Sequence, residues 1–340
     1  MKGDGGMTIR ERQERDEEAR LSPYAALSSR SAGRAHPIST CDLRTCYQRD
    51  RDRIIHCKSF RRLKYKTQVF LTPMGDHYRT RLTHTLEVSQ VARTLARSLR
   101  LNEDLTEAAA LGHDLGHTPF GHIGESTLNR LLPGGFRHNE QSLRVAERLE
   151  NDGQGLNLCR ETLDGILNHS GQNEPKTLEG WCVRRADRIA YINHDIDDAI
   201  RGGILKPFEL PRRCLSVLGE THGERIDTMI RDIVTTSMDQ PFVRMSEEVR
   251  QASEELRAFL FEYVYHDEWR KKEEARCDYI LSALYEHYLA HPEQLPAEYL
   301  EINFTEGAER AVCDFIACMT DRYAIDQFSE IFVPGAFGRR

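Results

Sequence analysis

Apolar residues recur three and four positions apart over most of this chain, and charged residues fill the positions between them. This spacing is typical of amphipathic helices, whereas runs of β-branched residues are few. We therefore expect a mainly α fold. The expected helices lie at about 42–65, 82–99, 103–117, 123–132, 138–150, 160–168, 180–200, 244–289 and 306–330.

The expected elements suggest an arm and two helical regions. Residues 1–35 are rich in Arg, Glu, Gly and Ser, a composition that buries too little apolar surface to offset the entropy of ordering, so we expect a flexible arm. Residues 36–205 would form a catalytic core, and residues 206–340 a helical C-terminal region packed on it. A short strand is expected at 299–304. Turns are expected at Gly134-Gly135, His169–Lys176 and Gly202-Gly203.

The overall charge excludes some classes of partner. The 340 residues include 47 basic and 54 acidic ones, a net charge of -7 that argues against bulk binding to DNA or to anionic membranes and still permits a local basic cleft. No apolar run approaches a membrane span, and the N-terminus lacks the apolar segment of a signal peptide. The cysteines are odd in number and none forms a C-x2-C pair, which fits reduced thiols. We expect a cytoplasmic protein without a membrane partner.

His84 is the first candidate for chemistry. On a helix it shares one face with Val88, Val91 and Leu95, so its imidazole points into the fold. A single histidine in such a place is most often a hydrogen-bonded core residue.

The next segment, LGHDLGHTPFGHIGE, makes that simple interpretation less attractive. His113, Asp114, His117, His122 and Glu125 stand here within thirteen positions of an otherwise small and apolar stretch. Burying so many ionisable groups without partners would cost several kcal/mol each, whereas a divalent cation would compensate them. The donors suit Mn, Fe, Co, Zn or Mg.

A further carboxylate comes from the segment WCVRRADRIAYINHDIDDAI. Asp187, Tyr191 and Asp195 fall four residues apart, on one face of a helix. A solvated acidic stripe would have the same spacing. With the earlier segments, however, Asp187 completes the order H...HD...D.

This order resembles the HD phosphohydrolases, which implies that His84, His113, Asp114 and Asp187 hold the metal. The sequence motifs around these residues are more specific. HYRTRLTHTLEV, HDLGHTPFGHIGE, FRHNEQS and ADRIAYINHDIDD are similar to the bacterial dGTPase-type deoxynucleoside triphosphate triphosphohydrolases, over about residues 21–334. The resemblance implies an HD-domain helical fold and hydrolysis of dNTPs, dGTP or a broader set, to deoxynucleoside and inorganic triphosphate.

The resemblance also implies roles around the metal. Arg81 would contact phosphate, and its position three residues before His84 lets its guanidinium reach the cavity. By the resemblance, Gln68 and Asp195 recognise the sugar 3'-hydroxyl and Tyr191 contacts sugar and phosphates. His138 would line the cavity, although it could equally cap a helix.

For proton transfer, His122 is the candidate, with Glu125 three residues later to orient its imidazole. The metal would polarise a phosphoryl oxygen and activate a water for attack on the α-phosphorus, a choice of phosphorus that comes from the resemblance. His117 could contact phosphate or, if two metals bind, act as an extra ligand.

Other interpretations stay open. Residues 51–66 carry seven basic side chains against Asp52, and about half of these would form a solvated face. This basic segment could bind single-stranded DNA in a non-catalytic oligomer, or the core could belong to a 5'-nucleotidase, a cyclic-nucleotide phosphodiesterase or an alarmone hydrolase. The resemblance further implies a homo-oligomer, such as a hexamer, and a dNTP effector. Surplus apolar surface at Phe259–Tyr265 would fit an interface.

Overall fold

The computed structural model of this chain describes residues 6–68, 79–264 and 268–334. Sixteen α-helices make up most of these residues, and β-structure among them is limited to two isolated bridges, Arg34 with Cys159 and Thr67 with Thr80. The expected mainly α fold is confirmed.

The helices in chain order are α1 Ile9–Arg20, α2 Cys46–His56, α3 Lys58–Arg62, α4 Arg81–Ser98, α5 Glu103–Gly112, α6 His122–Leu131, α7 His138–Arg144, α8 Arg160–Leu167, α9 Leu178–Arg201, α10 Arg212–Leu218, α11 His222–Ser237, α12 Glu247–Tyr263, α13 Glu268–Ala290, α14 Ala297–Glu306, α15 Ala308–Cys318 and α16 Asp321–Phe332. A π-helical turn, Val145–Leu149, extends α7.

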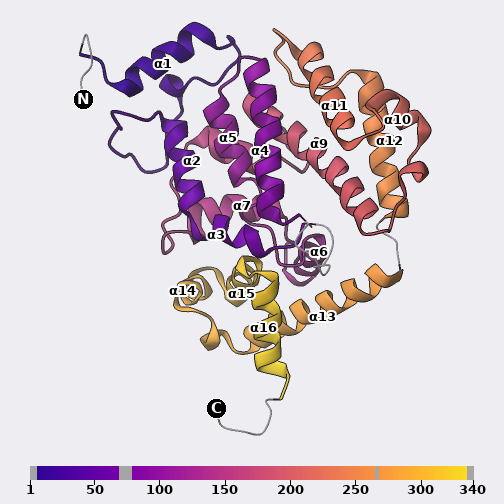
Figure 1. Cartoon of the computed structure of the whole chain (residues 1–340). Helices are drawn as coiled ribbons and strands as arrows, with labels where there is room; N and C mark the ends of the chain where they lie inside the picture. Colours follow the sequence, from indigo (N-terminus) through magenta and orange to yellow (C-terminus); the bar gives the residue numbers. More distant parts are fainter. Residues whose placement is uncertain (1–5, 69–78, 265–267, 335–340) are drawn as a thin grey trace.

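Helices α4, α5 and α9 pack against one another at the centre of the molecule (Figure 1). Val88 and Leu95 of α4 and Ile189 of α9 are fully buried between them, as the periodic spacing of their apolar residues requires. Helices α2 and α8 pack on α5, and α10–α12 extend the same core on the side of α9. Three rigid helices therefore meet where the candidate ligands lie.

The C-terminal helices form a second core with α6. Leu281, Leu284 and Ile316 are fully buried there, together with Leu128 of α6. In Figure 1, α13–α16 lie below the central helices, at the end where α6 is found.

Asp321, the first residue of α16, ties this second core to the central helices. Its carboxylate accepts hydrogen bonds from the Thr67 backbone N–H at 2.8 Å, from the Thr67 hydroxyl, and from the Phe120 backbone N–H at 2.9 Å. The buried Lys66 ammonium group donates to the carbonyls of His117 and Ala317, the latter at 2.8 Å. Hydrogen bonds to the C-terminal helices thus fix the segments that precede α4 and α6.

The N-terminal segment differs from the expected flexible arm. Helix α1 begins with a Thr8–Glu11 capping box, although α1 itself buries no residue. Glu17 accepts from the Ser28 backbone N–H at 2.7 Å, and the fully buried Glu179 accepts from that of Ala26 at 2.9 Å. Carboxylates that accept backbone N–H groups hold the described part of this segment, and a count of aliphatic residues misses such contacts.

The expected strand at 299–304 is wrong, because these residues lie in α14. Pro296 precedes the helix and Gly307, at φ 96°, ends it. Leu300 and Phe304, which would share one face of a strand, are 37% and 92% exposed and so form no buried face.

Several expected helices are shorter than predicted. The one at 42–65 breaks at Cys57, whose backbone is extended. The one at 244–289 becomes α12 and α13, and residues 265–267 lie outside the described residues. Helices α10 and α11 were not located in advance.

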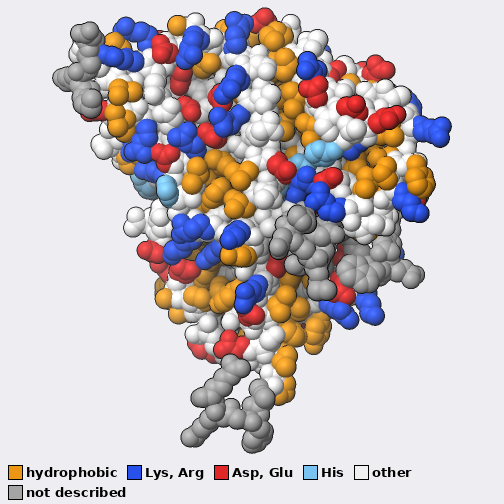
Figure 2. Space-filling view, viewed as in Figure 1, with side chains coloured by type: hydrophobic (Ala, Val, Ile, Leu, Met, Phe, Trp, Pro, Cys, Tyr) orange, Lys and Arg blue, Asp and Glu red, His pale blue; other side chains and the backbone are white. Residues whose placement is uncertain are grey.

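The surface mixes charges of both signs. On the face in Figure 2, basic and acidic side chains are interspersed, so neither sign covers that face continuously. Arg51 of the basic segment pairs with Asp52 and Glu107, and Arg53 donates to the carbonyl of Leu156. Local contacts thus account for these charges.

We predict that Asp321→Ala lowers the free energy of unfolding by about 2–5 kcal/mol, because two buried backbone N–H groups lose their acceptor. Urea denaturation followed by circular dichroism measures the change. Asp326→Ala, an exposed aspartate on the same helix, is the matched control and should change it by less than about 0.5 kcal/mol. Equal stability of the two variants would contradict the role of Asp321.

Candidate metal centre

His84 and Asp187 face each other across the contact between α4 and α9. Thr80 caps α4, so that Arg81 and His84 lie in its first turn. His84 Nε2 is 3.1 Å from Asp187 Oδ1, and the Asp187 side chain keeps a quarter of its surface exposed to the cavity described below. These are two of the four predicted ligands.

The other nitrogen of His84 is held by neighbouring groups. Its Nδ1 is 3.4 Å from His194 Nδ1, and His194 Nε2 lies 3.3 Å from a Glu87 carboxylate oxygen. Burial, with the charges of His84 and Arg79, lowers the pKa of His194 to about 2, so His194 is neutral. With its one proton toward Glu87, His194 accepts from His84 Nδ1, which leaves His84 Nε2, the atom that faces Asp187, as the nitrogen available to a cation.

His113 and Asp114 follow directly after α5 and are buried. His113 Nδ1 lies 2.7 Å from the Ala110 carbonyl oxygen, which can only accept, so Nδ1 donates and Nε2 is the nitrogen available to a cation. That atom is buried without a hydrogen-bond partner among the described residues, 3.6 Å from Asp114 Oδ2 and 3.8 Å from Asp187 Oδ1.

These four side chains fit a divalent cation. The donor atoms of His84, His113 and Asp114 lie within 4.8 Å of one another. Burial alone would raise the pKa of Asp114, but the charges of His113 and Arg81 hold it well below its usual range. Burial is likewise outweighed for Asp187, whose pKa is lowered by His84 and His113. Two carboxylates and two imidazoles therefore lie close together, a donor set that suits several transition metals.

The guanidinium of Arg81, which was expected to contact phosphate, contacts groups of the protein in this structure. Its Nη1 donates to Asp114 Oδ2 at 2.7 Å and its Nη2 to the Gln68 carbonyl at 3.4 Å. Arg81 lines the cavity, but its strongest contact is this carboxylate. A phosphate would have to share the guanidinium with Asp114.

The turn before α6 brings two more predicted residues to the cavity. Gly121 has φ 60° and ψ -133°, a conformation available essentially to glycine, and a Cβ there would lie 3.1 Å from the Gln68 carbonyl oxygen. His117 is buried beside this turn, and burial together with Arg81 lowers its pKa well below the usual value. The side chain of His122, at the start of α6, is 53% exposed.

Glu125 lies between two histidines. Its Oε2 is 3.7 Å from His122 Nδ1, longer than a hydrogen bond, whereas its Oε1 accepts from both the backbone N–H and Nδ1 of His138 at 2.9 Å. Burial would lower the pKa of His138, but the hydrogen bond to Glu125 raises it. In this structure Glu125 therefore orients His138 more firmly than His122.

His169 is a site residue that the sequence analysis assigned to a turn. Its Nδ1 lies 2.7 Å from the Ile166 carbonyl oxygen and its Nε2 3.2 Å from His138 Nε2. Burial and the neighbouring histidines lower its pKa to about 3, so it is neutral. The signal was present, because LNHS follows an apolar helix just as LGHD does.

One cavity of about 690 Å³ contains most of these residues. Predicted residues that line it are Gln68, Arg81, His84, Asp114, His117, His122, His138, Asp187 and Tyr191. Asp195 is buried on α9 and is not among the lining residues, so its predicted contact with the sugar stays a prediction.

Four arginines that the sequence analysis did not single out complete the wall of this cavity: Arg184, Arg185, Arg188 and Arg257. Arg184 donates to the carbonyls of the 168–173 turn, and Arg185 lies over the Trp181 ring. Burial and neighbouring arginines lower the pKa of Arg185 and Arg188, which means that their positive charges are incompletely compensated. An anionic group would relieve this repulsion.

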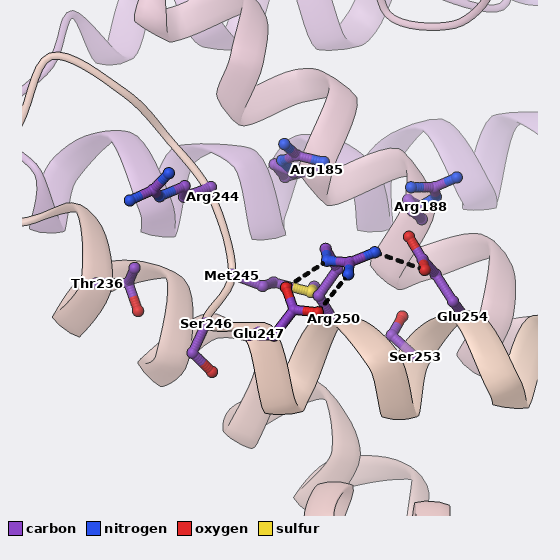
Figure 3. Close-up of a pocket in the computed structure, with 10 residues that line it drawn as sticks. All are labelled: Arg185, Arg188, Thr236, Arg244, Met245, Ser246, Glu247, Arg250, Ser253 and Glu254. Atoms are coloured by element: carbon purple, nitrogen blue, oxygen red, sulfur yellow. Dashed lines mark hydrogen bonds and ion pairs between the residues drawn. The ribbon is translucent and has the colours of Figure 1, made fainter.

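Arg185 and Arg188 also line a second cavity of about 450 Å³, beside α12 (Figure 3). There Arg250 pairs with Glu247 at 2.6 Å and with Glu254 at 2.7 Å. Because these acids compensate Arg250, the first cavity is the better place for a polyanion.

Comparison with known proteins identifies the family. The HD domain matches residues 81–192, and the phosphohydrolase-associated domain matches residues 243–330. A deoxyguanosinetriphosphate triphosphohydrolase-like protein of Caldanaerobacter subterraneus subsp. tengcongensis is 59% identical over 96% of this chain and 97% of its own length. Proteins of the same name from Clostridium perfringens (51% identical; 96% of this chain, 98% of theirs) and Geobacter sulfurreducens (42%; 94% and 96%) also match. The chain belongs to this family.

As a deoxyguanosinetriphosphate triphosphohydrolase-like protein, the chain is an HD-type phosphohydrolase, and the HD match contains all four predicted metal ligands. The associated domain covers all of α12–α15 and most of α16, and so includes much of the second core. No helix in the described ranges combines the length and apolar character that a membrane crossing needs.

We predict that Asp114→Ala abolishes metal binding and leaves the helical fold intact, because it removes a carboxylate shared by the buried donors. Elemental analysis of purified protein measures metal per chain, and circular dichroism checks the fold. Asp198→Ala is the matched control: Asp198 is also buried but pairs with Arg79, so that variant should retain the metal. Metal retained by the Asp114 variant would refute the site.

Proposed function

We propose that this protein hydrolyses dNTPs, dGTP or a broader set, to deoxynucleoside and inorganic triphosphate. One observation supports this proposal above all: a cluster of metal-binding donors and four arginines line the same cavity. Its volume of about 690 Å³ lies within the usual range for small-ligand sites. The names of the relatives favour a deoxynucleoside triphosphate as the ligand.

The arginines would bind the phosphate chain. Arg188 directly follows Asp187 on α9, so a phosphate held by Arg188 also lies near the metal donors. A triphosphate carries about four negative charges, and guanidinium groups bind phosphate oxygens in bidentate fashion. Tyr191 and Gln68 line the same cavity and would contact the sugar.

A divalent cation bound by His84, His113, Asp114 and Asp187 supplies a Lewis acid that polarises a phosphoryl oxygen and lowers the pKa of a water. His122 would transfer the proton to the leaving 5'-oxygen, since its exposed imidazole lies at the cavity. Glu125 would accept from His122 Nδ1 after closing the present 3.7 Å separation, because such contacts tighten when substrate binds.

We predict that His122→Ala lowers kcat by about 10²-fold or more while the bound metal is retained, because a positioned acid is lost. Steady-state kinetics and elemental analysis measure the two quantities. The matched control is His291→Ala, since the His291 side chain is 52% exposed and also lies beside a glutamate, but far along the chain in the C-terminal region. An unchanged kcat for His122→Ala would exclude it from catalysis.

The bond that breaks provides a second test. With dGTP in ¹⁸O-water, we expect deoxyguanosine and intact triphosphate, with the label in the triphosphate, because attack at the α-phosphorus makes the 5'-oxygen the leaving group. Chromatography and mass spectrometry identify the products. Orthophosphate or dGMP as the first product, or label in the 5'-hydroxyl, would favour a nucleotidase or another HD phosphohydrolase.

A further inference from the structure

Two cysteines that are distant in the sequence lie together in the fold. Cys46 is the first residue of α2, and Cys159 directly precedes α8. Cys159 forms a small buried cluster with Tyr47 and Leu105, and Cys46 packs against this cluster. All nine cysteines of the chain lie in its described part and are free, but the thiols of Cys46 and Cys159 hydrogen-bond to each other. We call these two residues the thiol pair.

A buried ion pair between Arg34 and Asp50 holds the backbone on both sides of the thiol pair. The two side chains are 7% and 0% exposed. Arg34 Nη2 donates to the Cys46 carbonyl at 2.8 Å, and the Arg34 backbone forms a β-bridge with Cys159. Asp50, one turn after Cys46 on α2, accepts from the Cys159 backbone N–H at 2.8 Å. The neighbouring positions of the two sulfurs are therefore built into the core and do not depend on a surface loop.

The two thiols differ in exposure and in acidity. Cys46 is half-buried, whereas Cys159 is fully buried. The hydrogen bond with Cys159 lowers the pKa of Cys46 and outweighs the effect of burial, whereas the same hydrogen bond together with burial raises the pKa of Cys159. The thiolate is the nucleophilic form of cysteine. Cys46 is therefore the sulfur that reacts first with a small oxidant, and Cys159 is the thiol next to it.

We propose that Cys46 and Cys159 form a reversible disulfide within the folded protein when it reacts with a hydroperoxide such as hydrogen peroxide. The Cys46 thiolate attacks the peroxide, so that an S–O bond forms, the O–O bond breaks and hydroxide leaves and takes up a proton. The Cys159 sulfur then attacks the Cys46 sulfenic acid: the S–S bond forms, the S–O bond breaks, and the Cys159 proton leaves with the hydroxide as water. Two thiols are oxidised to one disulfide, and one hydrogen peroxide is reduced to two waters.

The disulfide would join two parts of the structure that already share a neighbour. Helices α2 and α8 both pack on α5, so the bridge connects elements that are held in place by the same helix. The loop that it closes contains α4 and α5 and therefore His84 and His113. A cross-link that closes so long a loop stabilises the folded state mainly by restricting the unfolded chain. Neither the metal nor a dNTP takes part, so this inference is independent of the proposed function.

Cys41 provides the matched control. It is half-buried like Cys46, and hydrogen bonds from the backbone N–H groups of Leu43 and Arg44 lower its pKa to about 7. By acidity alone Cys41 should also react with peroxide. Its contacts among the described residues are with Leu43 and Arg44, however, and not with a second thiol. Cys41→Ser should therefore leave the disulfide between Cys46 and Cys159 intact.

The test maps the bond that peroxide produces. Full-length protein is reduced, freed of reductant, treated with hydrogen peroxide, then denatured, alkylated and digested. Mass spectrometry should find the Cys46 peptide linked to the Cys159 peptide in the wild type and in Cys41→Ser, and dithiothreitol should separate them. Cys46→Ser should leave Cys159 free to be alkylated. By circular dichroism the bridged protein should unfold at the same or a higher temperature than the reduced protein.

Cys159 that stays free in the peroxide-treated wild type, with Cys46 oxidised only to a sulfinic acid or linked to Cys41, would overturn the proposal. A lower unfolding temperature after oxidation would also overturn it, because the fold would then have to distort to form the bond. Protein oxidised in urea should give mixed pairings, and the same mixture from folded protein would contradict a pairing set by the fold. If Cys46→Ser does not fold, Cys46→Ala replaces it, and the wild-type peptide map still decides.

Discussion

The buried ion pair between Arg81 and Asp114 is the interaction on which the site depends. The two groups meet at 2.7 Å with side chains only 3% and 4% exposed. Removing one partner would leave a buried charge uncompensated, which typically costs 3–5 kcal/mol. Arg81 is fixed at the start of α4 by the Thr80 cap, and Asp114 follows α5. The pair therefore sets the relative position of the two helices that carry His84 and His113.

The same guanidinium links the site to the C-terminal helices. Arg81 also donates a hydrogen bond to the Gln68 carbonyl. Thr67, the residue before Gln68, donates its backbone N–H to the Asp321 carboxylate of α16. Asp321 holds Phe120 as well, directly before the Gly121 turn that positions His122. The turn before α6 and the cavity rim at Gln68 thus share one buried carboxylate from a separate core. Loss of packing among α13–α16 would therefore disturb the site through the hydrogen bonds of Asp321.

The sequence predicted the fold class and the central helices because their apolar spacing is regular. The sequence also predicted that His84, His113, Asp114 and Asp187 lie close together, because the motifs that contain them are specific. Other features depend on contacts between distant residues. The described part of the N-terminal segment is held partly by a distant carboxylate, that of Glu179, which no local pattern reveals. His169 was assigned to a turn because it begins a polar run that ends at Lys176, whereas its place beside His113 and His138 follows from the packing of α8 on α5 and α7.

The net charge of the chain does not predict the local charge at the cavity, because that charge depends on which distant residues the fold brings together. The chain carries -7 overall, yet Arg184, Arg185, Arg188 and Arg257 gather at one cavity that also contains two ionised carboxylates. His169 and His194, which lie beside the site, are neutral and so add no positive charge to balance these carboxylates. A cation at the carboxylates and a polyanion at the arginines compensate each other as well as the protein. Each should therefore strengthen the binding of the other, since their attraction acts in a poorly hydrated site where charges are weakly screened.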